Sequence, residues 1–82
     1  MLIKFLKITI KNLVENPAEV VINEFVDENN VHYEVCLKPE DFGRVIGKHG
    51  QIIDSIRQIL KVVGKKKKIN YSVEVKQHLA KN

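Results

Sequence analysis

The sequence predicts an α+β fold, a two-layer sandwich in which three helices cover a three-stranded mixed sheet in the order α-β-β-α-α-β. Apolar residues recur every three or four positions over residues 2–14 and 51–63, a spacing typical of amphipathic helices. They alternate with polar residues over 31–37 and 69–75, as in half-buried strands. A chain of 82 residues forms one small domain, because at this size only about 60% of the unfolded surface is buried.

The first helix is expected over residues 2–14 and is ended by Asn16-Pro17, since proline disfavours helix at the residue before it. Lysines at positions 4, 7 and 11 share one face, so the segment is amphipathic. Its apolar stripe consists of Leu6, Ile10, Leu13 and Val14, with Leu2 or Ile3.

A hairpin follows. "VVINEFV" (20–26) is β-branched and aromatic, "DENN" (27–30) is a polar turn, and "VHYEVCL" (31–37) alternates apolar and polar residues. The second strand therefore has one buried face. His32 lies on the other face without a second ligand at useful spacing, so we interpret it as a solvent-facing strand residue.

Two consecutive helices are expected next. Pro39 followed by two acids marks a helix start, and Gly47 ends this helix after about two turns. The following helix runs from Gly50 to Val63, with Gly64 as its C-terminal cap. Its apolar stripe is Ile52, Ile56, Ile59, Leu60 and Val63.

The third strand is "INYSVEV" (69–75), which alternates apolar and polar residues. Two helices in succession bring the chain back to the sheet beside an earlier strand, so the sheet is expected to be mixed. We expect one domain over residues 1–76 and a C-terminal tail without pattern over 77–82.

Positive charge is concentrated in one part of the chain. Residues 44–68 hold eight Lys or Arg against one acid, whereas the remainder holds six Lys against nine acids. Such a distribution attracts polyanions, although a charge run is often just a solvated surface. The run "KKKK" (65–68) is expected to be a flexible contact that increases non-specific affinity and salt sensitivity.

"VIGKHGQII" (45–53) matches the (I/V)-I-G-x-x-G-x-x-I signature of the KH RNA-binding domain at every fixed position. The element order resembles the type II form of that domain over nearly the whole chain. "LVENPAEV", "PEDFGRVIGKHG" and the total length resemble the small single-KH proteins of bacteria, the KhpA type. A bare G-x-x-G is weak evidence. Between two helices, and in this order of elements, it is strong.

The physical chemistry of the glycine loop points to the same ligand. Gly47 and Gly50 lack Cβ atoms, so a sugar-phosphate backbone can approach the main chain. Gly50 precedes a helix whose free N–H groups and dipole favour an anion, and Lys48 and His49 add donors. We predict that the RNA-binding residues are Arg44, Ile46, Gly47, Lys48, His49, Gly50, Ile53 and Arg57.

The resemblance implies an apolar groove between the helix pair and the second strand, in which Ile46 and Ile53 face Val35 or Leu37. The alternative is that Ile46 and Ile53 are core residues. Arg57, four residues before Lys61, either extends the phosphate track or solubilises the helix. The low aromatic content argues against a stacking platform.

Other function classes fit less well. A Walker A loop needs a different motif, and strands on both sides of the helix pair disfavour a DNA-binding helix-turn-helix. The histidines are scattered and no carboxylate pair stands beside a nucleophile, so we expect no enzyme, no metal and no cofactor. The lone Cys36, the lack of a signal-peptide cleavage site and the lack of a long apolar run indicate a cytoplasmic protein without membrane insertion.

We therefore expect a non-catalytic protein that binds single-stranded RNA as an RNA chaperone or post-transcriptional regulator. A single KH domain grips only about four nucleotides, and pairing two modules raises avidity. The resemblance accordingly implies a homodimer, or a heterodimer with a larger KH-containing protein of the Jag type, and a link to cell elongation and division. The alternative is a subunit whose main role is that pairing, with Ile59 or Val63 as candidate contacts.

Overall fold

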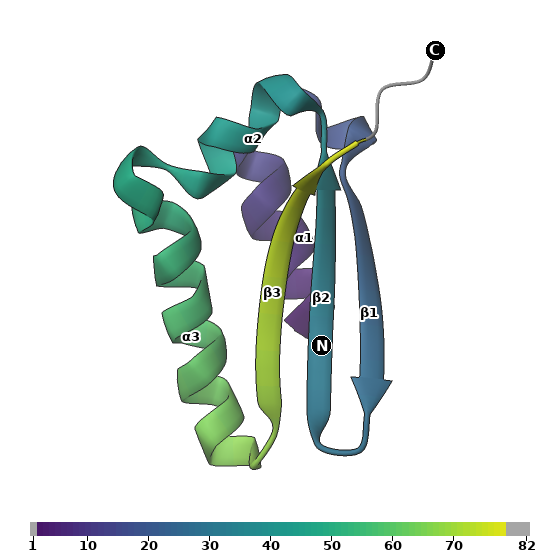
Figure 1. The fold of residues 1–82 in the computed structure, drawn as a ribbon, viewed down its shortest axis with the longest axis vertical. Coiled ribbons are helices and arrows are strands. Elements are labelled where there is room, and N and C mark those ends of the chain that lie inside the picture. Colours follow the sequence, from purple (N-terminus) through teal and green to yellow (C-terminus); the bar gives the residue numbers. More distant parts are fainter. Residues whose placement is uncertain (1, 79–82) are drawn as a thin grey trace.

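A computed structural model describes residues 2–78, and its elements follow the predicted order (Figure 1). The first half consists of α1 (Leu2–Leu13), the 3₁₀ turn η1 (Pro17–Glu19), β1 (Val21–Asp27) and β2 (Asn30–Leu37). The second half consists of α2 (Pro39–Ile46), the 3₁₀ turn η2 (Lys48–Gly50), α3 (Gln51–Lys67) and β3 (Asn70–Gln77). The predicted α+β class and type II order of elements are confirmed.

The sheet is mixed, as predicted. β2 is its central strand and pairs antiparallel with β1, from Val21 opposite Cys36 to Asp27 opposite Asn30. β2 also pairs parallel with β3, and the crossover that a parallel pair requires is made by α2, η2 and α3. The helices cover one face of the sheet and α3 lies along its β3 side (Figure 1).

The alternating pattern of β2 places the core. Tyr33, Val35 and Leu37 point into it and are at most 1% exposed, whereas His32 lies on the open face with its Nδ1 2.6 Å from Ser72 Oγ. Side chains of α1, α2 and α3 pack on the buried face of the sheet. These are Leu6, Ile10, Val45, Ile53, Ile56 and Leu60.

The prediction that Gly64 caps the last helix is wrong. α3 continues to Lys67. The next residue, Lys68, has a left-handed backbone at φ 59° and donates its N–H to the Gly64 carbonyl. Gly64 is a buried residue inside the helix. Glycine is needed there because a Cβ would lie 2.3 Å from the carbonyl oxygen of Ile69. Most of the lysine run is therefore helical and not a flexible segment.

Two further expectations are corrected at the margins of the fold. Ile59 is 46% exposed and does not belong to the buried stripe of α3, whereas Ile53 is buried there. β3 continues to Gln77, two residues past the expected end of this strand, and the His78 N–H donates to the Leu37 carbonyl over 2.8 Å. Residues 79–82 of the expected tail lie outside the described residues.

Candidate nucleic-acid interface

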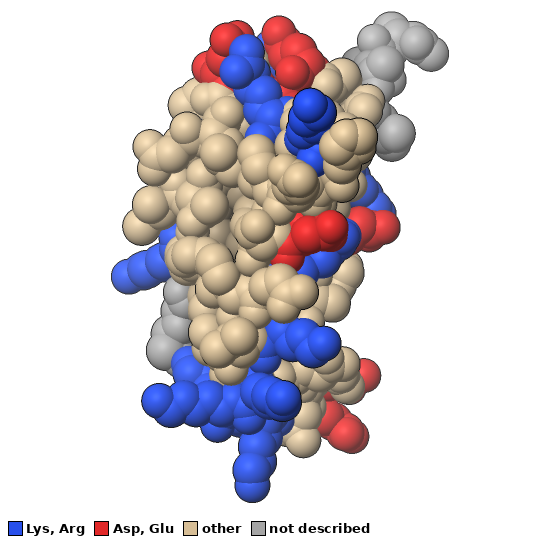
Figure 2. Space-filling view, turned by 90° about the vertical axis from the view of Figure 1, so that its left-hand side faces the viewer, with Lys and Arg blue, Asp and Glu red and all other residues tan. Residues whose placement is uncertain are grey.

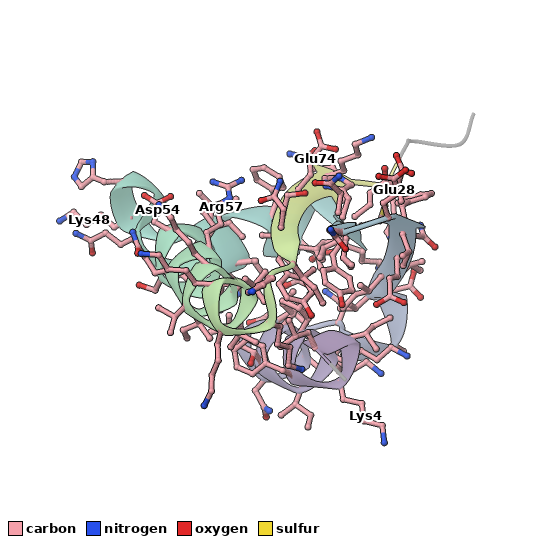
Figure 3. The ribbon with its side chains drawn as sticks, turned by 90° about the horizontal axis from the view of Figure 1, so that it is seen from below. Lys4, Glu28, Lys48, Asp54, Arg57 and Glu74 are labelled. Carbon is pink, nitrogen blue, oxygen red and sulfur yellow. The ribbon has the colours of Figure 1, made fainter. Side chains whose placement is uncertain are left out.

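The G-K-H-G segment forms an open loop that joins α2 to α3 and projects at one side of the molecule (Figure 1). Its backbone takes positive φ angles of 78° at Gly47, 57° at His49 and 74° at Gly50. Lys48 and His49 are exposed, both glycines are partly exposed, and Lys48 points away from the body of the protein (Figure 3). The main chain of this loop therefore faces solvent.

The two loop glycines are needed for different reasons. Gly47 combines φ 78° with ψ 173°, a region that only glycine occupies readily, and a Cβ would lie 2.6 Å from Ile52 Cγ1. Gly50 is left-handed, and among the described residues a Cβ there would meet only Asp54 Oδ2, at 3.8 Å. Gly47 thus serves the fold, whereas the space over Gly50 is free for a ligand.

The loop offers main-chain donors beside a cation. The N–H of Gly50 donates to the Gly47 carbonyl over 3.1 Å, and the N–H of Gln51 donates to the Lys48 carbonyl. None of the hydrogen bonds that the described residues make in turns, loops and caps uses the N–H group of Lys48 or His49. Two amide donors and an exposed ammonium group in one turn form a surface suited to a phosphate oxygen.

Arg44, which is predicted to contact RNA, is paired with acidic side chains of the protein itself. Its Nη2 lies 2.7 Å from Glu15 Oε1, and its Nε lies 3.7 Å from Asp41 Oδ1. It therefore takes part in a network that joins α2 to the segment after α1. An RNA contact from Arg44 requires exchange of the Glu15 carboxylate for a phosphate.

Asp41 is the centre of this network and was not recognised as such from the sequence, where it reads as an acid at a helix start. It is 1% exposed, and its carboxylate accepts the N–H groups of Glu15 and Asn16 and the side-chain amide of Asn16, at 2.9–3.0 Å. Burial alone would raise the pKa of the Asp41 carboxyl, but these hydrogen bonds and the nearby guanidinium outweigh it and hold the pKa below its usual value.

Arg57 lies on the flank of α3 that faces β3. Its Nη2 donates to the Val73 carbonyl over 3.2 Å, and its Nη1 lies 3.6 Å from Asp54 Oδ1 (Figure 3). The guanidinium is half exposed, so a ligand that runs between α3 and β3 has access to it.

The prediction that β2 forms one wall of the apolar groove is wrong. Val35 and Leu37 of β2 are completely buried, and the strand beside α3 is β3. Ile53 is 3% exposed and belongs to the core, whereas Ile46 is partly exposed next to the loop. Of the two isoleucines that flank the loop, only Ile46 presents an accessible surface.

The sequence of this chain matches a known protein family. A family model described as KhpA/KhpB, KH domain matches residues 3–75. The chain belongs to the KhpA/KhpB KH-domain family.

Curated relatives of the chain carry the name RNA-binding protein KhpA. The one from Clostridium perfringens is 36% identical over 72 residues, which covers 88% of this chain and 96% of the relative. The one from Caldanaerobacter subterraneus subsp. tengcongensis is 38% identical with the same two coverages, and the one from Chlamydia trachomatis is 36% identical over 88% of this chain and 92% of the relative. No solved structure matches the chain.

Neither a metal-ion site nor a membrane-spanning helix is found among the described residues. Among residues 2–78, no group of three or more His, Cys, Asp or Glu side chains is placed to hold a metal ion. None of the helices in the described part of the chain has the length and apolar character needed to span a bilayer.

Proposed function

We propose that this KH protein binds single-stranded RNA at the G-K-H-G loop and performs no catalysis. A phosphate lies over Gly50, accepts hydrogen bonds from the amides of Lys48 and His49, and is neutralised by the Lys48 ammonium. The observation that carries the proposal is the open main chain of residues 47–50 with free space over Gly50. Relatives of similar length named as RNA-binding proteins support it.

The neighbouring residues have graded roles in this proposal. Ile46 offers apolar surface to the RNA base next to the loop. Arg57 contacts the RNA where it leaves the loop and runs along β3. Gly47 and Ile53 act indirectly, because they hold the loop on the start of α3. We propose that the protein works in the cytoplasm as an RNA chaperone or post-transcriptional regulator with effects on cell elongation and division.

A double substitution tests the loop. Lys48→Asp with His49→Asp places two carboxylates where the phosphate should lie, and both side chains are exposed, so the core is untouched. We expect the affinity for a short single-stranded RNA to fall more than about tenfold, because juxtaposed like charges cost several kcal/mol. Circular dichroism and melting temperature should stay close to those of the wild type.

The matched control is Lys4→Asp with Lys7→Gln on α1, which lowers the formal net charge by the same amount with His49 counted as neutral. Lys4 lies on the opposite side of the molecule from Lys48 (Figure 3). If the control variant and the loop variant lose RNA affinity equally, or if neither loses any, the assignment of the loop is falsified.

A second candidate function is a pairing subunit, in which RNA binding is secondary. Ile59 and Val62 of α3 are 46% and 69% exposed, and with Gln58 and Val63 they line a shallow pocket of about 240 Å³. Such a surface suits a second copy of the chain or a larger KH-containing protein of the Jag type. A dimer in sedimentation without RNA binding at low salt would favour this function over the first.

A further inference from the structure

A second basic surface lies at the far end of α3 from the G-K-H-G loop. A pocket of about 430 Å³ opens there, where the end of α3 meets the β1–β2 turn and the start of β3. Three lysines line it, namely Lys61, Lys65 and Lys68. Figure 2 shows basic side chains gathered at this end of the molecule.

The other lining groups are amides and apolar side chains. Asn70 donates its side-chain N–H to Asn30 Oδ1 over 3.0 Å, which leaves the Asn30 amino group and the Asn70 carbonyl oxygen for a ligand. Ile69 and Tyr71 are partly exposed and provide apolar surface. Cations suit a phosphate, paired amides suit the edge of a base, and an aromatic or aliphatic surface suits its face.

The negative end of the α3 dipole lies at this pocket and is offset by Lys61, Lys65 and Lys68. Free carbonyls at a helix C-terminus carry partial negative charge. Here the Gly64 carbonyl accepts the N–H groups of Lys68 and Ile69, the latter over 2.9 Å. Within the described part of the chain, no acidic residue lines the pocket. The lysines therefore dominate its electrostatics.

A row of side chains connects the pocket to the loop. Asp54, Arg57, Lys61 and Lys65 follow each other at spacings of three and four after Gly50, so they share one flank of α3. Arg57 contacts β3 through Val73, and Lys61 and Lys65 line the pocket together with β3 residues. The one acid in the row, Asp54, is paired with Arg57 at 3.6 Å.

We propose that the pocket holds a further nucleotide of the same RNA strand that the loop grips, so that the binding footprint exceeds four nucleotides. This inference rests on the proposed function. The 17 residues of α3 span about 25 Å, so the strand has to continue along the flank between α3 and β3 to reach the lysines. The lysine run is then a specific part of the site and not only a source of general attraction.

The test compares RNA oligonucleotides of four and ten nucleotides. For the wild type we expect the decamer to bind about tenfold more tightly than the tetramer after its affinity is divided by seven, the number of four-nucleotide registers that a decamer offers. In Lys61→Gln with Lys65→Gln this gain should disappear, while tetramer affinity stays unchanged. The salt slope for the decamer should become shallower by about 0.7 for each phosphate that a lysine no longer neutralises. The control, Lys4→Gln with Lys7→Gln, removes the same charge on α1 and should keep the full gain.

The other outcomes separate the two proposals. A wild type that binds the tetramer but gains nothing with length beyond the number of registers overturns the pocket and leaves the loop standing. Equal losses for both lengths in the lysine variant, or an equal loss in the α1 control, mean general electrostatics and also overturn the pocket. If the wild type binds neither oligonucleotide at low salt, the proposed function is refuted and this inference with it.

Discussion

Substituting Gly64 by alanine sets two opposed effects against each other. In a helix interior, alanine is favoured over glycine by about 1 kcal/mol. The new Cβ, however, would lie 2.3 Å from the Ile69 carbonyl oxygen and 3.1 Å from Tyr71 Cδ2. The first distance is about 1 Å shorter than an ordinary contact, and the atom that must move belongs to the backbone that starts β3.

We expect the clash to dominate. Overpacking costs about 1–3 kcal/mol, and weakening of the Ile69 N–H bond to the Gly64 carbonyl adds about 1 kcal/mol. After the gain in helix propensity, Gly64→Ala should destabilise the fold by roughly 1–3 kcal/mol. In a domain of this size the melting temperature should fall by on the order of 10 °C. Urea unfolding and thermal melting, both followed by circular dichroism, measure this change.

Gly43→Ala is the matched control. Gly43 also lies inside a helix, α2, but among the described residues a Cβ there has no neighbour within 4 Å. Only the propensity term remains, so this variant should be stabilised by up to about 1 kcal/mol. If Gly64→Ala is as stable as the wild type, the contact between the end of α3 and Ile69 does not restrict position 64, and the reasoning fails.

Three further outcomes are expected. Gly47→Ala should destabilise the fold by about 2–4 kcal/mol in urea unfolding, because backbone strain and the close contact with Ile52 act together. Gly50→Ala should cost only about 1–2 kcal/mol, because backbone strain acts alone there. Equal losses of stability would contradict the separate roles of the two glycines. Because the folded pKa of Asp41 is lowered, its carboxylate stabilises the fold above the unfolded pKa of about 3.9, and this is lost as the pH falls through the folded pKa. Asp41→Asn should therefore melt lower at pH 7 and show a flatter decline between pH 5 and pH 2; an unchanged profile would exclude this role. Val62→Glu should leave the melting temperature unchanged and dissociate any dimer in sedimentation if α3 is the pairing surface, and a persisting dimer would place the contact elsewhere.

The sequence was sufficient for the fold because its local signals agree with one another. The alternation in β2 gave the buried face, and Pro39 gave the start of α2. The prediction for Gly64 is wrong because a glycine followed by lysines is also typical of a helix C-terminus. Its real requirement is the approach of Ile69, a contact that depends on where the chain goes after α3.

The candidate site was predictable only where it is local in the chain. The exposed loop and the cations at positions 48 and 57 follow from a short motif and from helical spacing. The pairing of Arg44 with Glu15 joins residues 29 apart, so it required the fold. The identity of the strand beside α3, which is β3, also required the fold. So did the pocket, which brings Asn30 close to the lysines of α3.

The buried carboxylate of Asp41 restricts how the chain can be shortened. Its hydrogen-bond donors, Glu15 and Asn16, belong to the stretch that follows α1, and Leu6 and Ile10 of α1 are completely covered. A fragment that begins at the hairpin would leave the Asp41 carboxylate without these donors and an apolar sheet face without its cover. The N-terminal helix is thus an integral part of the smallest unit that can fold, and a fusion partner belongs before it and not in its place.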